Sequence, residues 1–197
     1  MMKRTMSWLV AGASCLLMAC ASAATTEISG VKLESPIELA GTKLVLNGAG
    51  IRYRTVIPVY VAGLYLVKKA NSPDAVQAVE GPKRISVTML RNINSSELGK
   101  IFIRGVENNT PKKDMFRLMP ALTGMSQLFT DHKNLEKGDT FSVDWIPNTG
   151  TVFLVNGKIV GGPFKEPEFF AAMLRIWLGP SPADWKLKDA LLGLPLG

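Results

Sequence analysis

Hydrophobic and polar residues alternate in short stretches through the first half of the chain. In residues 85–90, Ile, Val and Met are separated by Ser and Thr, the period-two pattern of a strand with one buried face. Shorter alternations at residues 31–39 and 43–46, and a Val- and Ile-rich run at residues 51–66, predict further strands. Pro58 lies in the middle of the last run and, because it cannot donate to a strand ladder, predicts a bend or edge between two strands.

The middle of the chain changes to helical period. Asn94 and Glu97 resemble a capping box, and the apolar stripe that follows predicts a helix over residues 95–109. A second helix is expected from Pro111, a favourable first-turn position, with Pro120 expected to kink or split it. Its predicted apolar face comprises Met115, Leu118, Met119, Leu122, Met125 and Phe129.

The last third returns to strands and ends in helices. Alternation and turn residues predict three strands, at residues 141–145, 151–155 and 158–160. A helix is expected over residues 167–178, and a short final helix after residues 181–184. This order predicts an α+β protein, an open-faced β-sandwich in which a helical layer covers one face of an antiparallel sheet.

The first 23 residues have the pattern of an export signal. Lys3 and Arg4 form a basic start, residues 8–18 are almost wholly apolar, and Ala21-Ser22-Ala23 offers small residues to a signal peptidase. We therefore expect cleavage near Ala23, a single domain over residues 24–197, and a periplasmic protein.

A lipid anchor at Cys20 is the alternative, because residues 17–20 loosely resemble a lipoprotein box. The two cysteines both fall within the first 20 residues, which excludes a disulfide scaffold from the remainder. No later stretch reaches about 20 apolar residues, so no transmembrane span is expected after signal removal.

The formal net charge of +7 is spread over isolated basic pairs rather than a continuous stripe, which argues against nucleic acid as a partner. His132, the only histidine, sits in a polar stretch without an orienting acid, so a catalytic triad is not expected. Glu166 and Glu168 are interpreted as charge bias at a helix start. The sequence predicts neither a metal site nor a cofactor, because residues 48–50 are glycine-rich but no helix follows them.

Arg52 and Arg54 are the most informative charged residues. They are two apart and therefore share one face of a predicted strand. An arginine on a half-buried strand face needs an anion or a carboxylate as its partner. A structural salt bridge, or a solvated strand edge, is the alternative explanation.

Several short motifs resemble the chalcone isomerase family. Residues 48–52 and 61–66 look like its opening strands, and residues 87–89, 95–109 and 155–158 follow in the same order. The resemblance continues through residues 169–182 and covers roughly residues 41–192. It implies the chalcone isomerase-like fold, with a ligand cleft between the sheet and the helices, and is closest to exported bacterial members.

The resemblance also assigns site residues. Arg52 falls on the arginine with which catalytic members polarise and orient a phenolic enone. The place of the catalytic tyrosine falls at or beside Leu98, and no tyrosine follows Tyr65 in the chain. Tyr60 stands where those members have a threonine, and Asn108 corresponds to the helix asparagine.

The resemblance also covers non-catalytic relatives that bind fatty acids, in which an arginine and a tyrosine hold the carboxylate. Arg52 and Tyr60 would make that pair, with Met115 and Met119 as an adaptable apolar wall, although core packing explains the methionines equally well.

Three functions remain in competition. The first is a non-catalytic periplasmic binder of a fatty acid or similar amphipathic carboxylate. The second is an intramolecular lyase of the chalcone isomerase type acting on a phenolic compound. The third is a partner-binding module of the cell envelope. The missing tyrosine favours the first, and the oligomeric state is left open.

Overall fold

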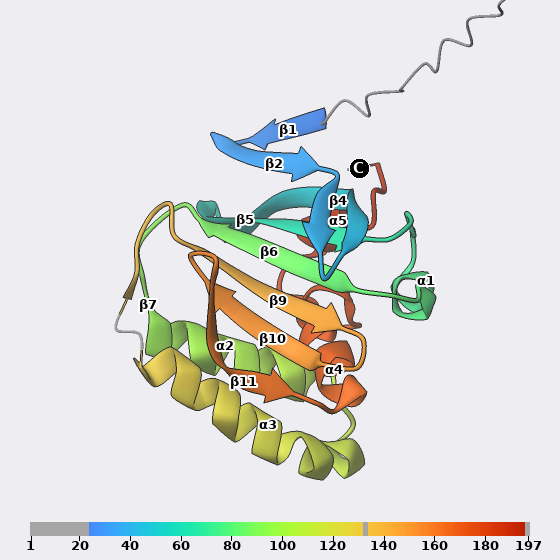
Figure 1. Cartoon of the computed structure of the whole chain (residues 1–197). Helices are drawn as coiled ribbons and strands as arrows, with labels where there is room; N and C mark the ends of the chain where they lie inside the picture. The colour runs from blue at the N-terminus through green and yellow to red at the C-terminus, as the bar shows by residue number, and fades with distance from the viewer. Residues whose placement is uncertain (1–23, 132–133, 196–197) are drawn as a thin grey trace, which may run out of the picture.

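The computed structural model describes residues 24–131 and 134–195, so the predicted export signal and His132 lie outside the described residues. Within them, seven strands form one antiparallel sheet in the order β11-β10-β9-β6-β5-β4-β3 (Figure 1). The strands are β3 (Ile37–Leu39), β4 (Thr42–Arg54), β5 (Ile57–Leu66), β6 (Lys83–Met89), β9 (Thr140–Ile146), β10 (Gly150–Val155) and β11 (Lys158–Phe164). The two-residue strands β7 (Ile93–Asn94) and β8 (Asn134–Leu135) pair separately.

Helices cover one face of this sheet (Figure 1). They are α1 (Pro73–Ala78), α2 (Ser95–Asn108), α3 (Lys112–Asp131), α4 (Pro167–Leu178) and α5 (Trp185–Leu191). The main core lies between the two layers, where alternate residues of β5 and β6 meet the apolar faces of α2 and α4. The predicted α+β architecture with one helical layer is confirmed.

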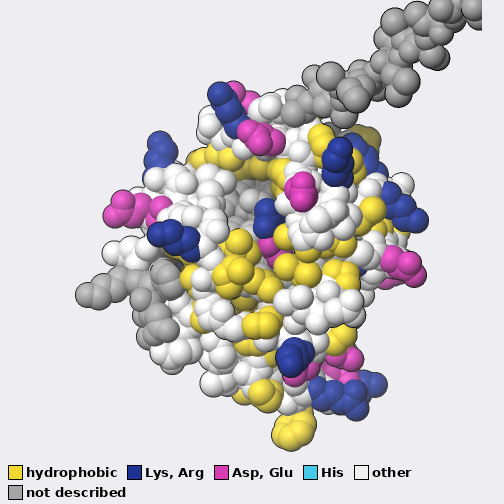
Figure 2. All heavy atoms as spheres, viewed as in Figure 1, with side chains coloured by type: hydrophobic (Ala, Val, Ile, Leu, Met, Phe, Trp, Pro, Cys, Tyr) yellow, Lys and Arg dark blue, Asp and Glu magenta, His cyan; other side chains and the backbone are white. Residues whose placement is uncertain are grey.

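The outer face of the sheet is partly covered by a separate hairpin, β1 (Ala24–Ile28) and β2 (Val31–Ser35). A Cβ on Gly63 would lie only 3.2 Å from Leu33, so glycine lets this hairpin pack closely on β5. On the face shown in Figure 2, basic and acidic side chains alternate around the rim and hydrophobic side chains gather toward the middle. The ion pair of Arg84 with Asp144, which joins β6 to β9, is buried at the Asp144 end.

The run at residues 51–66 does divide into two strands, but they meet at Thr55 and Val56 rather than at Pro58. β4 continues without a break from Thr42 to Arg54, and the turn falls at Thr55, whose φ is +60°. Pro58 is the second residue of β5 and pairs with Tyr53 where the register shifts. A bulged position needs no regular ladder donor, so the strand tolerates proline there.

Two helix predictions also need correction. Pro120 does not split α3, which runs from Lys112 to Asp131. Pro120 lies on the exposed side of the helix, where water can reach the carbonyl that loses its donor, and Thr123 Oγ1 donates to the Met119 carbonyl in the next turn. The short helix α1 has no counterpart among the helices expected from the sequence; Ser72 caps it by accepting a hydrogen bond from the Ala75 N–H.

Gly48 and Gly50 bring α5 against β4. A Cβ on Gly48 would lie 2.0 Å from the Ala190 carbonyl oxygen, and one on Gly50 would lie 2.7 Å from the Ala190 Cβ. Asn47 adds a polar link, because its side-chain amide donates to the Leu191 carbonyl oxygen at 2.7 Å. The glycine-rich segment thus serves helix packing, and this contact fixes the end of β4 that carries Arg52.

Candidate functional site: a basic cleft beside Arg52

A cleft of about 620 Å³ opens between the end of the β4–β5 hairpin, α2 and the segment that follows α4. Five basic side chains line it: Arg52, Arg54, Arg91, Lys100 and Arg104. Glu97 is the one acidic residue among those lining it, and apolar surface comes from Val59, Ile101 and Ile176. The cleft therefore combines strong positive charge with an apolar patch, as a site for an anionic amphipathic ligand requires.

Arg52 is the most constrained of the basic residues. Its Nε atom is buried and has no hydrogen-bond partner in the described structure, although a buried guanidinium N–H normally has one. Its Cζ atom lies 5.7 Å from the centroid of the Tyr60 ring, within the range of a cation–π contact. The strand thus holds one side of the guanidinium against an aromatic face and leaves its hydrogen-bonding capacity unused.

Tyr60 supports Arg52 from within the core. Its side chain is buried, and its hydroxyl oxygen accepts a hydrogen bond from Trp177 Nε1 at 2.9 Å. Burial raises the pKa of Tyr60 to about 12, although the Arg52 charge opposes the shift. The phenol is therefore neutral at physiological pH. Tyr60 lies next to Arg52, as expected, but its hydroxyl is engaged with α4 and does not line the cleft.

A pair of asparagines ends α2, and the two have different roles. Asn108 is exposed and lines the cleft with Arg52, so the structure brings these two predicted residues together. Asn109 is buried and clamps the segment after α4: its amide donates to the Ser181 carbonyl oxygen, and its oxygen accepts from the Ser181 N–H, both at 2.8 Å. Gly179 has no room for a Cβ beside Asn109. Asn109 thus positions one wall of the cleft.

Asp184 links a second wall to the strand that carries Arg52. One carboxylate oxygen caps α5 by accepting from the Leu187 N–H, and the other accepts from the Tyr53 N–H at 2.9 Å. Sequence reasoning identified neither this link nor that of Asn109. The Asp before a short helix was a visible capping signal, but its second partner is 131 residues away.

The methionines lie elsewhere. Met115 and Met119 belong to α3 and do not line the cleft with Arg52. Met119 is 51% exposed, because the buried stripe of α3 passes through Leu118, Leu122 and Met125 instead. Leu98, where the resemblance places the catalytic tyrosine, is buried in the core, and the cleft-facing position on the next turn is Ile101.

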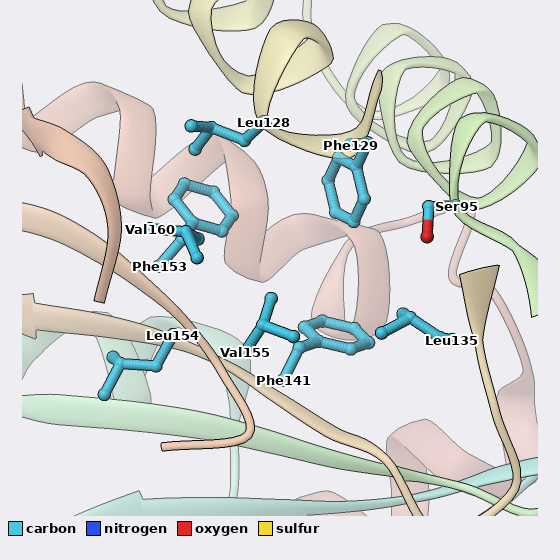
Figure 3. A pocket seen from close by; sticks show the side chains of 9 residues that line it. All are labelled: Ser95, Leu128, Phe129, Leu135, Phe141, Phe153, Leu154, Val155 and Val160. Atoms are coloured by element: carbon cyan, nitrogen blue, oxygen red, sulfur yellow. The ribbon is translucent and has the colours of Figure 1, made fainter. Parts of the chain in front are cut away.

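A second pocket lies between the start of α2, the end of α3 and strands β9–β11 (Figure 3). Its lining is apolar except for Ser95, whose buried hydroxyl has no hydrogen-bond partner in the described structure. Its volume of about 20 Å³ is that of roughly one water molecule. The pocket is too small to hold an acyl chain.

Neither a metal centre nor a membrane-spanning helix stands out in the part of the chain that the structure describes. No three His, Cys, Asp or Glu residues there gather closely enough to hold a metal ion. None of the described helices is both long and apolar enough to cross a bilayer.

The sequence profile of the chalcone isomerase-like family matches residues 24–193, and the chain belongs to that family. Among solved structures, the chain is similar to a fatty-acid binding protein of Arabidopsis thaliana, with a TM-score of 0.65 and 17% sequence identity. The similarity covers 87% of this chain and 96% of the plant protein, and it shows a shared fold. No curated protein matches the sequence.

Proposed function

We propose that this protein binds a fatty acid or a similar amphipathic carboxylate in the cleft beside Arg52, in the periplasm and without catalysis. The observation that carries the proposal is Arg52, which lines a cleft of predominantly basic charge while its buried Nε has no hydrogen-bond partner among the described residues. A carboxylate offers a guanidinium two parallel charge-assisted hydrogen bonds.

The apolar surface beside Arg52 suits the chain of such a ligand. Val59, Ile101 and Ile176 come from a strand and two helices that converge on the cleft. The interior behind them is filled by large buried side chains such as Phe102 and Trp177. The ligand chain is therefore expected to lie along the cleft rather than to enter the core.

The fold relationship supports the same ligand class. The Arabidopsis protein is named as a fatty-acid binder and has the same fold over nearly its whole length. The proposal for this chain rests on its own Arg52, and the plant protein shows that the fold accommodates such a ligand.

Titration calorimetry with laurate tests the proposal. Arg52→Ala should weaken laurate binding by roughly 1.5–3 kcal/mol, the usual contribution of hydrogen bonds to a charged group, or more than about tenfold. Tyr60→Phe should cost less affinity, because the ring beneath the guanidinium remains. Arg117→Ala, on the exposed side of α3 and away from the cleft, is the matched control and should bind like the wild type. Unchanged affinity in a folded Arg52→Ala variant would refute the anchor.

Catalysis as an intramolecular lyase is the less supported alternative. The described residues that line the cleft include no tyrosine or histidine, and the nearby Tyr60 hydroxyl is engaged with Trp177. General acid–base help from a positioned group typically contributes about 10²–10⁴-fold to a rate. We therefore expect no large acceleration of hydroxychalcone cyclisation over the uncatalysed rate, and stereospecific, saturable turnover would contradict the proposal.

The periplasmic location is proposed from the pattern of residues 1–23 alone. Intact-mass measurement of protein from the periplasmic fraction should give a chain that begins near Ala24. A lipidated Cys20 would instead assign the protein to the membrane surface.

A further inference from the structure

The basic charge of the cleft exceeds what one carboxylate needs. Five basic residues and one acid line it, so a ligand with a single negative charge would leave most of the positive charge uncompensated. Like charges held close together repel one another, and they destabilise the fold unless a counter-charge is present.

Among the described residues, no side-chain carboxylate forms an ion pair with these basic groups. The one ion pair among the described residues joins Arg84 to Asp144 on the opposite face of the sheet. Glu97 lines the cleft without forming an ion pair, and both oxygens of the nearby Asp184 accept hydrogen bonds from backbone N–H groups. The basic side chains of the cleft are therefore available to a ligand.

The basic residues lie on several segments around the cleft rather than on one side of it. Arg52 and Arg54 come from β4, and Arg91 comes from the segment after β6. Lys100 and Arg104 are four residues apart on α2, a spacing at which like charges weaken a helix by a few tenths of a kcal/mol. Three separate segments thus place positive charge around the same cleft, and the pair on α2 slightly destabilises that helix.

We infer that the ligand of this cleft carries a phosphate monoester as its head group, attached to an apolar chain. The inference rests on the proposed function and specifies the head group at the same site. A phosphate monoester carries a charge of about −1.5 to −2 at pH 7 and presents three acceptor oxygens, whereas a carboxylate has one charge and two oxygens. Arg52 holds one edge of the phosphate, and Lys100 and Arg104 approach it from α2.

The test compares three ligands by calorimetry at low salt and below the critical micelle concentration: dodecyl phosphate, laurate and inorganic phosphate. Dodecyl phosphate and laurate have the same chain length, so their difference reports on the head group. Dodecyl phosphate is expected to bind at least about tenfold more tightly than laurate at pH 8, a difference of about 1.4 kcal/mol. Inorganic phosphate should bind much more weakly, because it lacks the chain.

The pH dependence gives a second readout. The second proton of a phosphate monoester leaves near pH 6, so dodecyl phosphate affinity should rise between about pH 5.5 and pH 8. The titratable side chains that line the cleft are arginine, lysine and glutamate, residue types that ordinarily titrate outside this range, so laurate affinity should change little.

Variants separate the head-group inference from the proposed function. The double variant Lys100→Ala/Arg104→Ala should weaken dodecyl phosphate binding at least about thirtyfold and laurate binding no more than about ninefold, the scale of two exposed charges, whereas Arg52→Ala should weaken both. Lys112→Ala/Lys113→Ala, on the exposed start of α3, is the matched control. Equal affinity for the two amphiphiles, with neither affected by the α2 variant, would overturn the inference and leave the proposed function standing. If neither binds, or if inorganic phosphate binds as tightly as dodecyl phosphate, both are overturned.

Discussion

The two sides of α2 face very different surroundings. On the inner side, Phe102 and Val106 are buried in a dense aromatic cluster, with the Phe102 ring about 5.5 Å from those of both Phe129 and Trp177. On the other side, Lys100 and Arg104 are exposed and line the basic cleft. One helix thus closes the core and contributes to a site.

The buried polar groups on the two sides can be compared by their hydrogen-bond partners. In the core, the Trp177 N–H and the Tyr60 oxygen satisfy each other. At the edge of the cleft, the buried Nε of Arg52 has no such partner. Buried polar groups that lack a partner are exceptional in folded proteins. Ser95 on the core side also has one, a neutral hydroxyl, but Arg52 is the charged residue of this kind among the described residues and it lines the cleft.

The largest expected effect is on the packed side. Phe102→Ala should lower the free energy of unfolding by about 3–5 kcal/mol, because it opens a cavity among rings that cannot collapse into it. Phe116→Ala is the matched control: Phe116 is 84% exposed on α3, and its loss should change stability by less than about 0.5 kcal/mol. Urea unfolding of the two variants measures the difference, and equal losses would contradict the contrast.

The next largest effect is a loss of folding stability at alkaline pH. The pKa of Tyr60 is about 12 in the folded protein against 10 for an exposed tyrosine, so between these pH values the folded state retains a proton that the unfolded state has lost. Stability should therefore fall as pH rises from about 10 to 12, with about 2–3 kcal/mol of the loss due to Tyr60.

Tyr60→Phe should remove this part of the pH dependence, whereas Tyr53→Phe at the exposed hairpin end should not. Tyr65, with a pKa also raised to about 12 by burial, contributes a similar slope, and Lys83, with a pKa lowered by burial, contributes an opposite one. Unfolding titrations of the three proteins at several pH values isolate Tyr60. A Tyr60→Phe variant with the wild-type slope would show that this phenol is not protonated in the folded state at pH 11.

The adjacent asparagines compare a positioning residue with a lining residue. Asn109→Ala loses the hydrogen bonds to Ser181 and Gly105 and should cost about 2 kcal/mol of stability. Laurate affinity should fall with it, because the wall after α4 is no longer held. Asn108→Ala should leave the melting temperature nearly unchanged, and a drop equal to that of Asn109→Ala would reverse the two assignments.

The smallest effect concerns the lone acid of the cleft. Glu97→Gln removes one negative charge from a site for an anion and should strengthen laurate binding about two- to threefold, the scale of one exposed charge. The gain should shrink as salt is raised from 0.05 to 0.5 M, because salt screens exposed charges. Weaker binding in this variant would mean that Glu97 holds the ligand rather than opposing it.

Local patterns were sufficient for most of the fold. Alternation over residues 85–90 predicted β6, and the Asn94 cap with its apolar stripe predicted α2 close to its observed ends. Pro58 and Pro120 were misinterpreted for one reason: whether a missing N–H matters depends on what lies opposite it. A bulge beside Pro58 in its own strand, and solvent beside Pro120 on its helix, made both prolines tolerable.

The site was less predictable because it depends on distant partners. Arg52 was identifiable as a charge on a predicted strand face, and Asn108 through the family resemblance. Asn109 and Asp184 act through hydrogen bonds to residues 72 and 131 positions away, which no local pattern reports. Met119 was misplaced because helical spacing defines the buried face of a helix only to within about one residue. Neighbouring residues at the border of that face, such as Leu118 and Met119, differ strongly in exposure.

The packing of α5 on β4 has a consequence for the order of folding. Asn47 bonds to Leu191 and Tyr53 to Asp184, so two walls of the cleft are joined by contacts 144 and 131 residues apart. Contacts of such separation form late and slow the folding of a chain. During synthesis the strand that carries Arg52 is complete long before residues 184–191 exist, so the nascent chain holds the anchor without the cleft. The cleft is thus complete only when the final helix docks.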